Sequence, residues 1–250
     1  IDVTVTDVVR VTDLVKRFHF RRSDGGLLPT FSGGAHVVVE MREDGQTRLN
    51  PYSLMSSPLD TKDYTISVRR DDQGRGGSLF MHNQVEPGQR MVISNPVNLF
   101  SLDLRARKHL MIAGGIGITP FMAQIAQLAS EGGNFDLHYC SRALIHGAYA
   151  DVLRSRHGNR VTLYHSEENN RLNIGRLLST QPVGTHLYVC GPARLIDAVL
   201  ATAKALGWPD EAVHSEHFTA PQNGVPFDVT LALSGKQIHV GEQQSLLEAI

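Results

Sequence analysis

A glycine-rich turn able to bind a pyrophosphate lies near the middle of this 250-residue sequence. The segment Gly114–Pro120 reads Gly-Gly-Ile-Gly-Ile-Thr-Pro and directly follows the apolar run His109–Ala113. Glycines let a backbone approach a pyrophosphate closely, amides at the start of the next helix meet its charge, and Pro120 suits a first helical turn. Pro120 replaces the third glycine of the dinucleotide fingerprint, so a strand-to-helix turn without a ligand is the alternative.

A second turn of this kind is Cys190-Gly191-Pro192, which follows the apolar run His186–Cys190. A buried thiol at a strand end is usually a packing residue. In an open parallel sheet, however, the end of a central strand faces the crevice where a nicotinamide would lie. Both interpretations of Cys190 stay open.

Two polar motifs stand in the N-terminal half, at Asn50–Leu54 and Gly74–Ser78. A tyrosine ring followed by a hydroxyl can pack against an aromatic cofactor and hydrogen-bond its polar edge. An arginine with two glycines and a serine at a helix start can form a phosphate nest. Each motif alone is also compatible with an ordinary strand or loop. Together, ahead of a nucleotide-binding half, they indicate a second phosphorylated cofactor.

The twelve histidines are scattered along the chain and predict no metal site. His214 and His217 are three apart in an expected strand, which would place them on opposite faces. No Gly-x-Ser-x-Gly nucleophile motif is present.

The elements that would position these motifs change in type along the chain. Up to residue 104, short β-rich runs alternate with turns and predict an antiparallel barrel. From residue 105 to 218, apolar strands alternate with helical stretches, which predicts a parallel-sheet α/β domain whose ligand lies beyond the carboxyl ends of the strands. The expected strands are Val3–Val9, Val37–Met41, Tyr64–Val68, Met91–Ile93, His109–Ala113, Phe135–Cys140, Val161–His165 and His186–Cys190; the expected helices are Ser78–Val85, Phe121–Ser130 and Leu195–Leu206.

Residues 219–226 have the Pro/Gly-bearing composition of a linker. After it we expect two strands, Phe227–Leu233 and Gln237–Val240, and a helix start with a capping box of Ser245 and Glu248. These elements bury too little apolar surface for a domain, so we interpret residues 227–250 as the opening of a third one.

Composition excludes several classes of protein. A hydrophobic content of 41% with 23 glycines describes a globular chain, and a net charge of −1 argues against a nucleic-acid or anionic-membrane binder. Two cysteines cannot supply a four-cysteine cluster within these residues. The absence of an apolar run of about 18 residues and of a signal-peptide pattern predicts a cytoplasmic protein that does not span a membrane.

The order of the β-rich half, the two polar motifs and the two glycine turns resembles the ferredoxin-NADP reductase superfamily, and most closely the phthalate dioxygenase reductase family of Rieske oxygenase systems. The resemblance covers nearly the whole chain. It implies a flavin-binding β-barrel, an NAD-binding α/β domain and the start of a plant-type [2Fe–2S] ferredoxin domain of β-grasp fold, whose cluster cysteines lie outside the residues given.

The resemblance also assigns site residues. The implied flavin contacts are Tyr52, Ser53, Leu54, Ser67, Val68, Arg69, Arg75, Gly76, Gly77, Ser78, Thr119 and Phe218, and the Gly-Arg-Gly-Gly-Ser form favours FMN over FAD. Family members usually carry arginine two residues before the tyrosine. Asn50 stands there instead, so Arg48, Arg69 and Arg75 are the cations left for the phosphate.

For the nucleotide, the resemblance implies that Gly114, Gly115, Ile116 and Gly117 hold the pyrophosphate and that Cys190, Gly191 and Pro192 lie by the nicotinamide. Arg142 would contact the adenosine half or be a solvated strand-end charge. NADH is expected, with NADPH left open because a Ser141-Arg142 pair can serve a 2′-phosphate. Ser53, Cys190 and Phe218 are the residues expected nearest the reacting rings.

The implied function is an NAD(P)H-dependent flavin oxidoreductase, the reductase component of a multicomponent oxygenase. Hydride would pass from NADH to FMN, and electrons would then pass singly through [2Fe–2S] to a terminal oxygenase, with the reductase a monomer. The alternatives are a stand-alone FAD-dependent reductase of the same superfamily and a nucleotide-responsive binding module without turnover.

Overall fold

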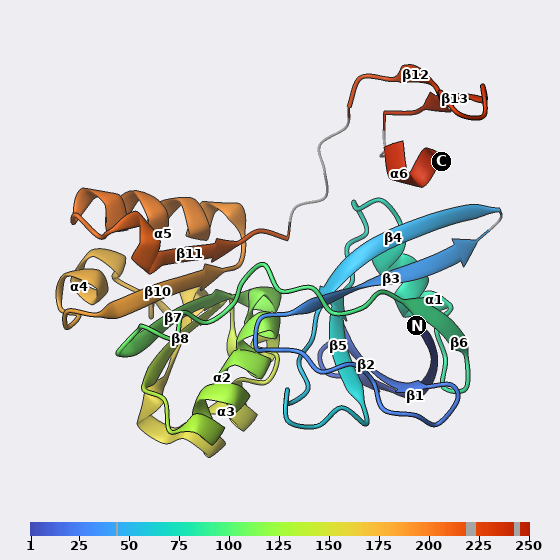
Figure 1. The fold of residues 1–250 in the computed structure, drawn as a ribbon. Helices are drawn as coiled ribbons and strands as arrows, with labels where there is room; N and C mark the ends of the chain where they lie inside the picture. Colours follow the sequence, from blue (N-terminus) through green and yellow to red (C-terminus); the bar gives the residue numbers. More distant parts are fainter. Residues whose placement is uncertain (44, 219–223, 243–245) are drawn as a thin grey trace.

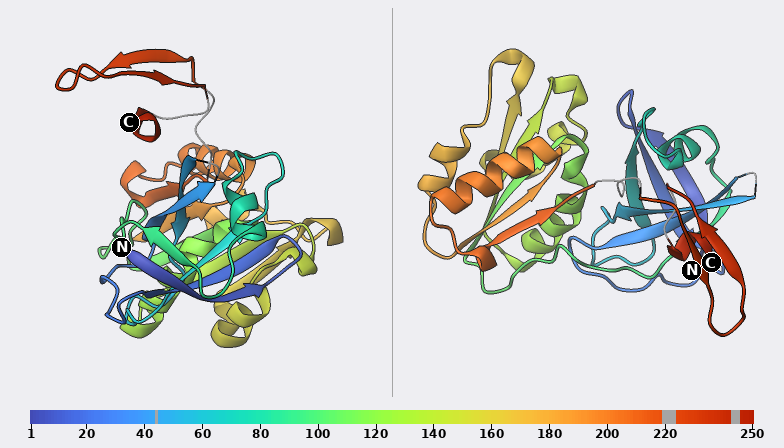
Figure 2. Two further views of the ribbon diagram at one scale, coloured as in Figure 1. Left: turned by 90° about the vertical axis from the view of Figure 1, so that its right-hand side faces the viewer. Right: turned by 90° about the horizontal axis from the view of Figure 1, so that it is seen from above.

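The computed structural model describes residues 1–43, 45–218, 224–242 and 246–250. These residues form an antiparallel sheet, a parallel sheet flanked by helices, and a small C-terminal hairpin (Figure 1). The two larger sheets lie side by side, which Figure 2 shows from above.

The antiparallel sheet has six strands in the order β4-β3-β6-β1-β2-β5. Alternate side chains such as Val3, Val5, Phe18 and Phe20 point into one apolar core, as the two-residue period of a strand requires. The strands are β1 (Asp2–Arg10), β2 (Val15–Arg22), β3 (His36–Glu43), β4 (Gln46–Ser53), β5 (Tyr64–Arg69) and β6 (Arg90–Ile93), with helix α1 (Gly77–Asn83) between β5 and β6.

The four strands and the helix expected in this half are confirmed, with small shifts of their ends. Strands β2 and β4 were not expected from the sequence. Strand β2 alternates two buried phenylalanines with basic residues on its outer face, and β4 contains Pro51, which cannot donate a ladder hydrogen bond. Strand β4 lies at the edge of the sheet, where proline is tolerated.

The parallel sheet has five strands in the order β11-β10-β7-β8-β9. Its strands are β7 (Lys108–Gly114), β8 (Phe135–Ser141), β9 (Val161–His165), β10 (Thr185–Cys190) and β11 (Val213–Glu216). The chain order therefore reverses between β7 and β10. In open parallel sheets, ligands bind beyond the carboxyl ends of the strands at such a switch point.

Helices cover both faces of this sheet. In β7, Met111 and Ala113 pack toward α2 (Thr119–Glu131) and α3 (Ala150–His157), while Leu110 and Ile112 pack toward α4 (Ile174–Ser179) and α5 (Ala193–Ala205). Burial on both faces explains why β7 reads as a continuous apolar run. The expected helices correspond to α2 and α5, whereas α3 and α4 were not predicted, because both are short and α3 is largely polar.

The barrel docks onto helix α2. The Gly33 amide donates to Gln127 Oε1 at 2.8 Å, and Gln124 Nε2 donates to the Phe100 carbonyl at 2.6 Å. A Cβ on Gly33 would lie 2.6 Å from the Gln124 Cα, so the two backbones touch there. These contacts fix the antiparallel sheet relative to the parallel one.

The C-terminal part contains β12 (Phe227–Thr230), β13 (Gln237–Val240) and α6 (Leu246–Ala249). The expected strand to Leu233 was too long: residues 231–236 form a tight turn closed by bonds between Leu231 and both Lys236 and Gly235. Helix α6 lies beside β4 and β13. The expected Ser245 cap and most of the 219–226 linker lie outside the described residues. None of the helices in the described ranges has the length and apolar content to cross a membrane.

Candidate active site

The two glycine turns meet at the switch point of the parallel sheet. Ala113 of β7 pairs in register with Cys190 of β10. A Cβ on Gly117 would overlap the Cys190 carbonyl oxygen and lie 2.6 Å from the Gly191 nitrogen, and one on Gly191 would lie 2.9 Å from the Gly114 Cα. Glycine is required here because two backbones are in contact.

The first turn is a short 3-10 segment, η1 (Gly115–Ile118), that runs directly into α2. Gly115 has φ 54°, a left-handed conformation that glycine adopts without strain. Tyr139 Oη donates to the Gly115 carbonyl at 3.0 Å, and Thr119 Oγ1 donates to the Ile116 carbonyl at 3.0 Å. The turn is thus held by one hydrogen bond from β8 and by one from the first residue of α2. Its amide groups lead into α2, a helix of thirteen residues.

Cys190 and the half-buried Glu216 lie side by side at the ends of β10 and β11. They are partners in the parallel register, and Cys190 is fully buried. Burial raises the pKa of Glu216 to about 7, and burial, with Glu216 as a lesser cause, raises the pKa of the Cys190 thiol. Glu216 Oε2 is buried without a hydrogen-bond partner among the described residues. Cys190 was expected from the sequence, whereas Glu216 was not.

On the barrel, the expected flavin residues lie along β4 and the loop before α1. Ser53 is 5% exposed, and its Oγ is buried with no partner in the described part of the chain. Tyr52 packs against the barrel core, and burial raises its pKa to about 12. An orphaned hydroxyl beside a half-buried tyrosine is what a site for a polar-edged aromatic ring requires.

Two arginines lie at the loop that precedes α1: Arg75 belongs to the loop, and Arg48 reaches it from β4. Arg48 Nε donates to the Arg75 carbonyl at 3.2 Å, so strand β4 places a second guanidinium at this loop. Gly76 has φ 92°, and its Cβ would lie 3.4 Å from Arg48. Asn50 packs so closely on Gly77 that a Cβ there would overlap it. The Ser78 hydroxyl is bonded to the backbone N–H and C=O of Asp71.

The barrel, with the expected flavin residues, and the parallel sheet, with the expected nucleotide residues, approach each other at β5. Strand β5 lies beside η1. Ser67 Oγ and Tyr149 Oη are 2.6 Å apart, which joins β5 to the segment before α3. Tyr149 has φ 66°, which is rare for a residue with a Cβ. Ser67 was expected at the site and Tyr149 was not, because the Tyr149 hydroxyl acts across two domains and no local sequence pattern marks it.

Other expected site residues lie at the edges of this region. Leu54 and Val68 are buried in the barrel core, and Arg69 is exposed at the end of β5. Arg142 is exposed after β8, and its carbonyl accepts from the Glu167 amide at 2.9 Å. Phe218 is 45% exposed two residues beyond β11, and Pro192 precedes α5 as its N-cap.

Comparisons with known proteins agree with this arrangement. A family model described as the N-terminal domain of dimethylamine monooxygenase subunit DmmA-like proteins matches residues 91–213. The carnitine monooxygenase reductase subunit of Acinetobacter baumannii is 46% identical over 98% of this chain and 77% of its own length. The heme-dependent oxidative N-demethylase beta subunit of Ectopseudomonas mendocina is 42% identical over 100% of this chain and 79% of its own.

The solved structure of phthalate dioxygenase reductase superposes with a TM-score of 0.86 and is 30% identical, over 99% of this chain and 78% of that one. The chain belongs to the phthalate dioxygenase reductase family. The resemblance seen in the sequence is confirmed, as are the paired barrel and α/β fold. The protein is an NAD(P)H-dependent flavin oxidoreductase that serves as the reductase component of an oxygenase system.

Glu216 makes the stability of this reductase depend on pH. Its folded pKa of about 7 lies above the unfolded value of 4.5, so stability is lost as pH rises from about 4.5 through 7. The loss has an upper bound of about 3 kcal/mol. We expect the Tm of Glu216→Gln to exceed that of the wild type at pH 8 but not at pH 5, measured by calorimetry. A wild-type minus variant difference that is constant with pH would contradict this.

Tyr149 is expected to act as a positioning residue in this reductase. Tyr149→Phe removes the hydroxyl that bonds Ser67 and keeps the ring, so the fold should be retained while the two domains are held less firmly. We expect the rate of flavin reduction at saturating NADH to fall about fivefold, since a net hydrogen bond contributes about 1 kcal/mol. Stopped-flow reduction measures this, and an unchanged rate with an altered Tm would indicate a purely structural bond.

Proposed function

We propose that this reductase transfers hydride from NADH to FMN at the junction between the barrel and the parallel sheet. The observation that carries the proposal is the position of β5, which lies beside η1 and is bonded through Ser67 to Tyr149. It brings the expected flavin residues and the expected nucleotide residues to one place.

The barrel fits a flavin. The orphaned Ser53 hydroxyl would hydrogen-bond the polar edge of the ring system beside Tyr52 and Leu54. Arg75, Gly76, Gly77 and Ser78 would take the phosphate, with Arg48 as the second cation. Arg48, which reaches this loop and also pairs with Glu43, would add its charge to that of Arg75 at a terminal phosphate, which supports FMN over FAD and offsets the missing arginine at position 50. The remaining proposed contacts are Ser67, Val68, Arg69, Thr119 and Phe218.

The parallel sheet fits the nicotinamide nucleotide. The turn Gly114–Gly117 would hold the pyrophosphate on its amides, and Cys190, Gly191 and Pro192 would border the nicotinamide. Glu167 and Glu168 directly follow β9, and Glu167 is bonded to the backbone of Arg142. Carboxylates near the adenosine half would repel a 2′-phosphate, which supports NADH over NADPH.

The chain's own residues would position the rings and exclude water rather than exchange protons with substrate. Bound flavin would supply the conversion of a two-electron donor to single-electron transfer. The buried Cys190 keeps its proton, because burial raises the pKa of its thiol, so it is a neutral packing surface rather than a nucleophile. Glu216, protonated below about pH 7, can donate a hydrogen bond at the same edge.

Electrons would leave through a [2Fe–2S] centre to a terminal oxygenase. Phthalate dioxygenase reductase, the structural relative, is described as a modular structure for electron transfer from pyridine nucleotides to [2Fe–2S]. Helix α6 lies beside β4, the strand that ends at Ser53. The two sequence relatives described above are named for a carnitine monooxygenase and an N-demethylase, so we propose an oxygenase whose substrate carries an alkylated nitrogen.

Anaerobic mixing of purified protein with NADH tests the reductase activity. We expect bleaching of the flavin spectrum within seconds, a weaker response to NADPH, and an extracted cofactor with the mass of FMN. FAD in the extract would favour a stand-alone reductase. A colourless protein that neither binds flavin nor oxidises NADH would favour a binding module and overturn the proposal.

A further inference from the structure

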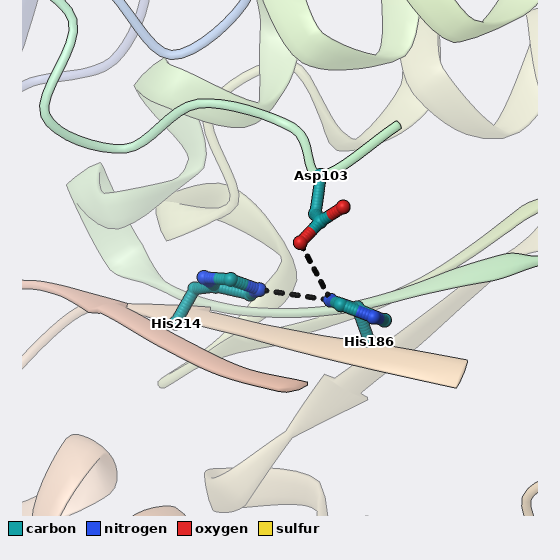
Figure 3. Close-up of side chains that lie close together, drawn as sticks. All are labelled: Asp103, His186 and His214. Atoms are coloured by element: carbon teal, nitrogen blue, oxygen red, sulfur yellow. Dashed lines mark hydrogen bonds and ion pairs between the residues drawn. The ribbon is translucent and has the colours of Figure 1, made fainter. Parts of the chain in front are cut away.

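A cluster of two histidines and an aspartate lies at the end of the parallel sheet opposite the glycine turns. Asp103 belongs to the connector between the barrel and β7, His186 is the second residue of β10, and His214 is the second residue of β11. Figure 3 shows the three side chains converging. Cys190 and Gly117 lie at the carboxyl ends of the strands, so this amino-end cluster is separate from the proposed reductase site.

The distances suit one small metal ion. His186 Nδ1 lies 3.1 Å from His214 Nε2 and 3.8 Å from Asp103 Oδ2, and one ligand atom of each residue lies within 4.8 Å of the others. Tetrahedral zinc with bonds of about 2.0–2.1 Å requires its ligand atoms to be about 3.3 Å apart. The two imidazole nitrogens already lie near this spacing, and rotation of the Asp103 side chain toward them would supply the third ligand.

The chain holds the cluster in place. The Asp103 amide donates to Tyr188 Oη at 2.8 Å, and the Asp103 carbonyl lies 3.3 Å from His109 Nε2. The Tyr188 ring stacks on His214 with centroids 4.4 Å apart. Ligands fixed by such surrounding contacts lose little conformational entropy when they bind an ion.

The cluster also has free electron pairs and an approach path. The contact between His186 Nδ1 and His214 Nε2 needs at least one neutral imidazole, whose nitrogen carries a lone pair that a metal can take. Arg105 is paired with the Asp103 carboxylate, but each carboxylate oxygen has two lone pairs, so Arg105 can stay bonded while the oxygen binds a metal. An open cavity of about 500 Å³ lies over Asp103 and His214 and is lined by residues 99–105 and 214–215.

We propose that Asp103, His186 and His214 bind one divalent transition-metal ion of the zinc type, with water at the fourth position. Two imidazoles and one carboxylate are a common donor set for zinc, and cobalt can replace it. The ion would clamp the connector between the domains onto the nucleotide-binding sheet. It would act on stability and on the accessibility of the connector rather than on hydride transfer.

Titration of the metal-free, flavin-loaded protein with zinc, followed by calorimetry, tests the proposal. We expect one equivalent to bind, and a Tm that rises by about 5 °C at a hundredfold excess over Kd. His186→Gln, His214→Gln and Asp103→Asn should each weaken binding by about tenfold or more. His217→Gln is the matched control, because His217 is exposed outside the cluster and should leave zinc binding unchanged. Cobalt should give the visible absorption bands of a four-coordinate ion in the wild type only.

Tryptic cleavage of the connector tests separately whether the ion clamps it onto the sheet. Arg105 and Arg107 lie on the connector beside the cluster, so zinc should slow tryptic cleavage there in the wild type and not in Asp103→Asn. A wild type that binds no zinc, or a His214→Gln variant that binds it equally well, would overturn the metal site. If a histidine variant fails to fold, zinc binding by Asp103→Asn tests the metal site instead, because this variant keeps the backbone hydrogen bonds of Asp103. Flavin reduction by NADH is a separate measurement, so either proposal can fail alone.

Discussion

Gly117→Ala is expected to abolish rapid reduction by NADH while leaving flavin in the protein. The added methyl group would overlap the Cys190 carbonyl oxygen and lie 2.6 Å from the Gly191 nitrogen. Both neighbours are backbone atoms at the end of a central strand, so neither can rotate away. The turn between β7 and α2 must shift, and a displacement of about 1 Å at a reacting centre can cost about a hundredfold in kcat/KM.

The same substitution at other glycines separates this effect from general damage. In Gly114→Ala the Cβ would meet Leu195 Cδ2, which can rotate away, and the ring carbon Pro192 Cδ, both at 2.7 Å. Because no backbone carbonyl is overlapped, we expect a smaller loss than in Gly117→Ala. Gly175→Ala in α4 meets only Asn173 Oδ1 at 3.7 Å and should behave as wild type. Stopped-flow reduction and flavin content measure the series. A Gly117→Ala variant with a kcat/KM within threefold of wild type would show that the two turns do not define the nucleotide site.

The sequence predicted those parts of the fold that have a local signature. The run His109–Ala113 is apolar because β7 is buried on both faces, and the glycines after it are needed where two backbones touch. Strand β2 was missed because its inward residues, Phe18 and Phe20, stand among basic residues on both sides, which the outer face of a barrel tolerates. Such an alternating pattern is weak when only two of its positions are strongly apolar.

Long-range contacts explain what the sequence did not predict at the site. Ser67 and Tyr149 are 82 residues apart, one on a barrel strand and the other just before α3, so only the docking of the barrel on α2 brings them together. Glu216 is a strand residue whose carboxyl is unusual only because Cys190 and buried surface surround it. The cluster of Asp103, His186 and His214 has no ligand spacing in the sequence, because β10 and β11 become neighbours only in the sheet.

Arg75→Ala is expected to yield largely flavin-free protein. If Arg75 holds the terminal phosphate of FMN, its removal takes away charge-assisted hydrogen bonds of about 3 kcal/mol, which is on the order of a hundredfold in Kd. Arg48 should matter for the same reason, because its guanidinium lies at the same loop and bonds the Arg75 carbonyl. We therefore expect Arg48→Ala to weaken FMN binding as well, though less, and the double variant to bind it least.

Fluorescence titration of the flavin-free proteins with FMN and with FAD measures these effects. Arg10→Ala is the matched control, because Arg10 forms an exposed pair with Asp13 and should leave both affinities unchanged. Because a terminal phosphate is present in FMN and internal in FAD, Arg75→Ala should lower the preference for FMN as well as the affinity. Stoichiometric flavin retained in the purified Arg75→Ala protein would refute the phosphate assignment, and the cations on β4 and β5 would then have to hold the phosphate instead.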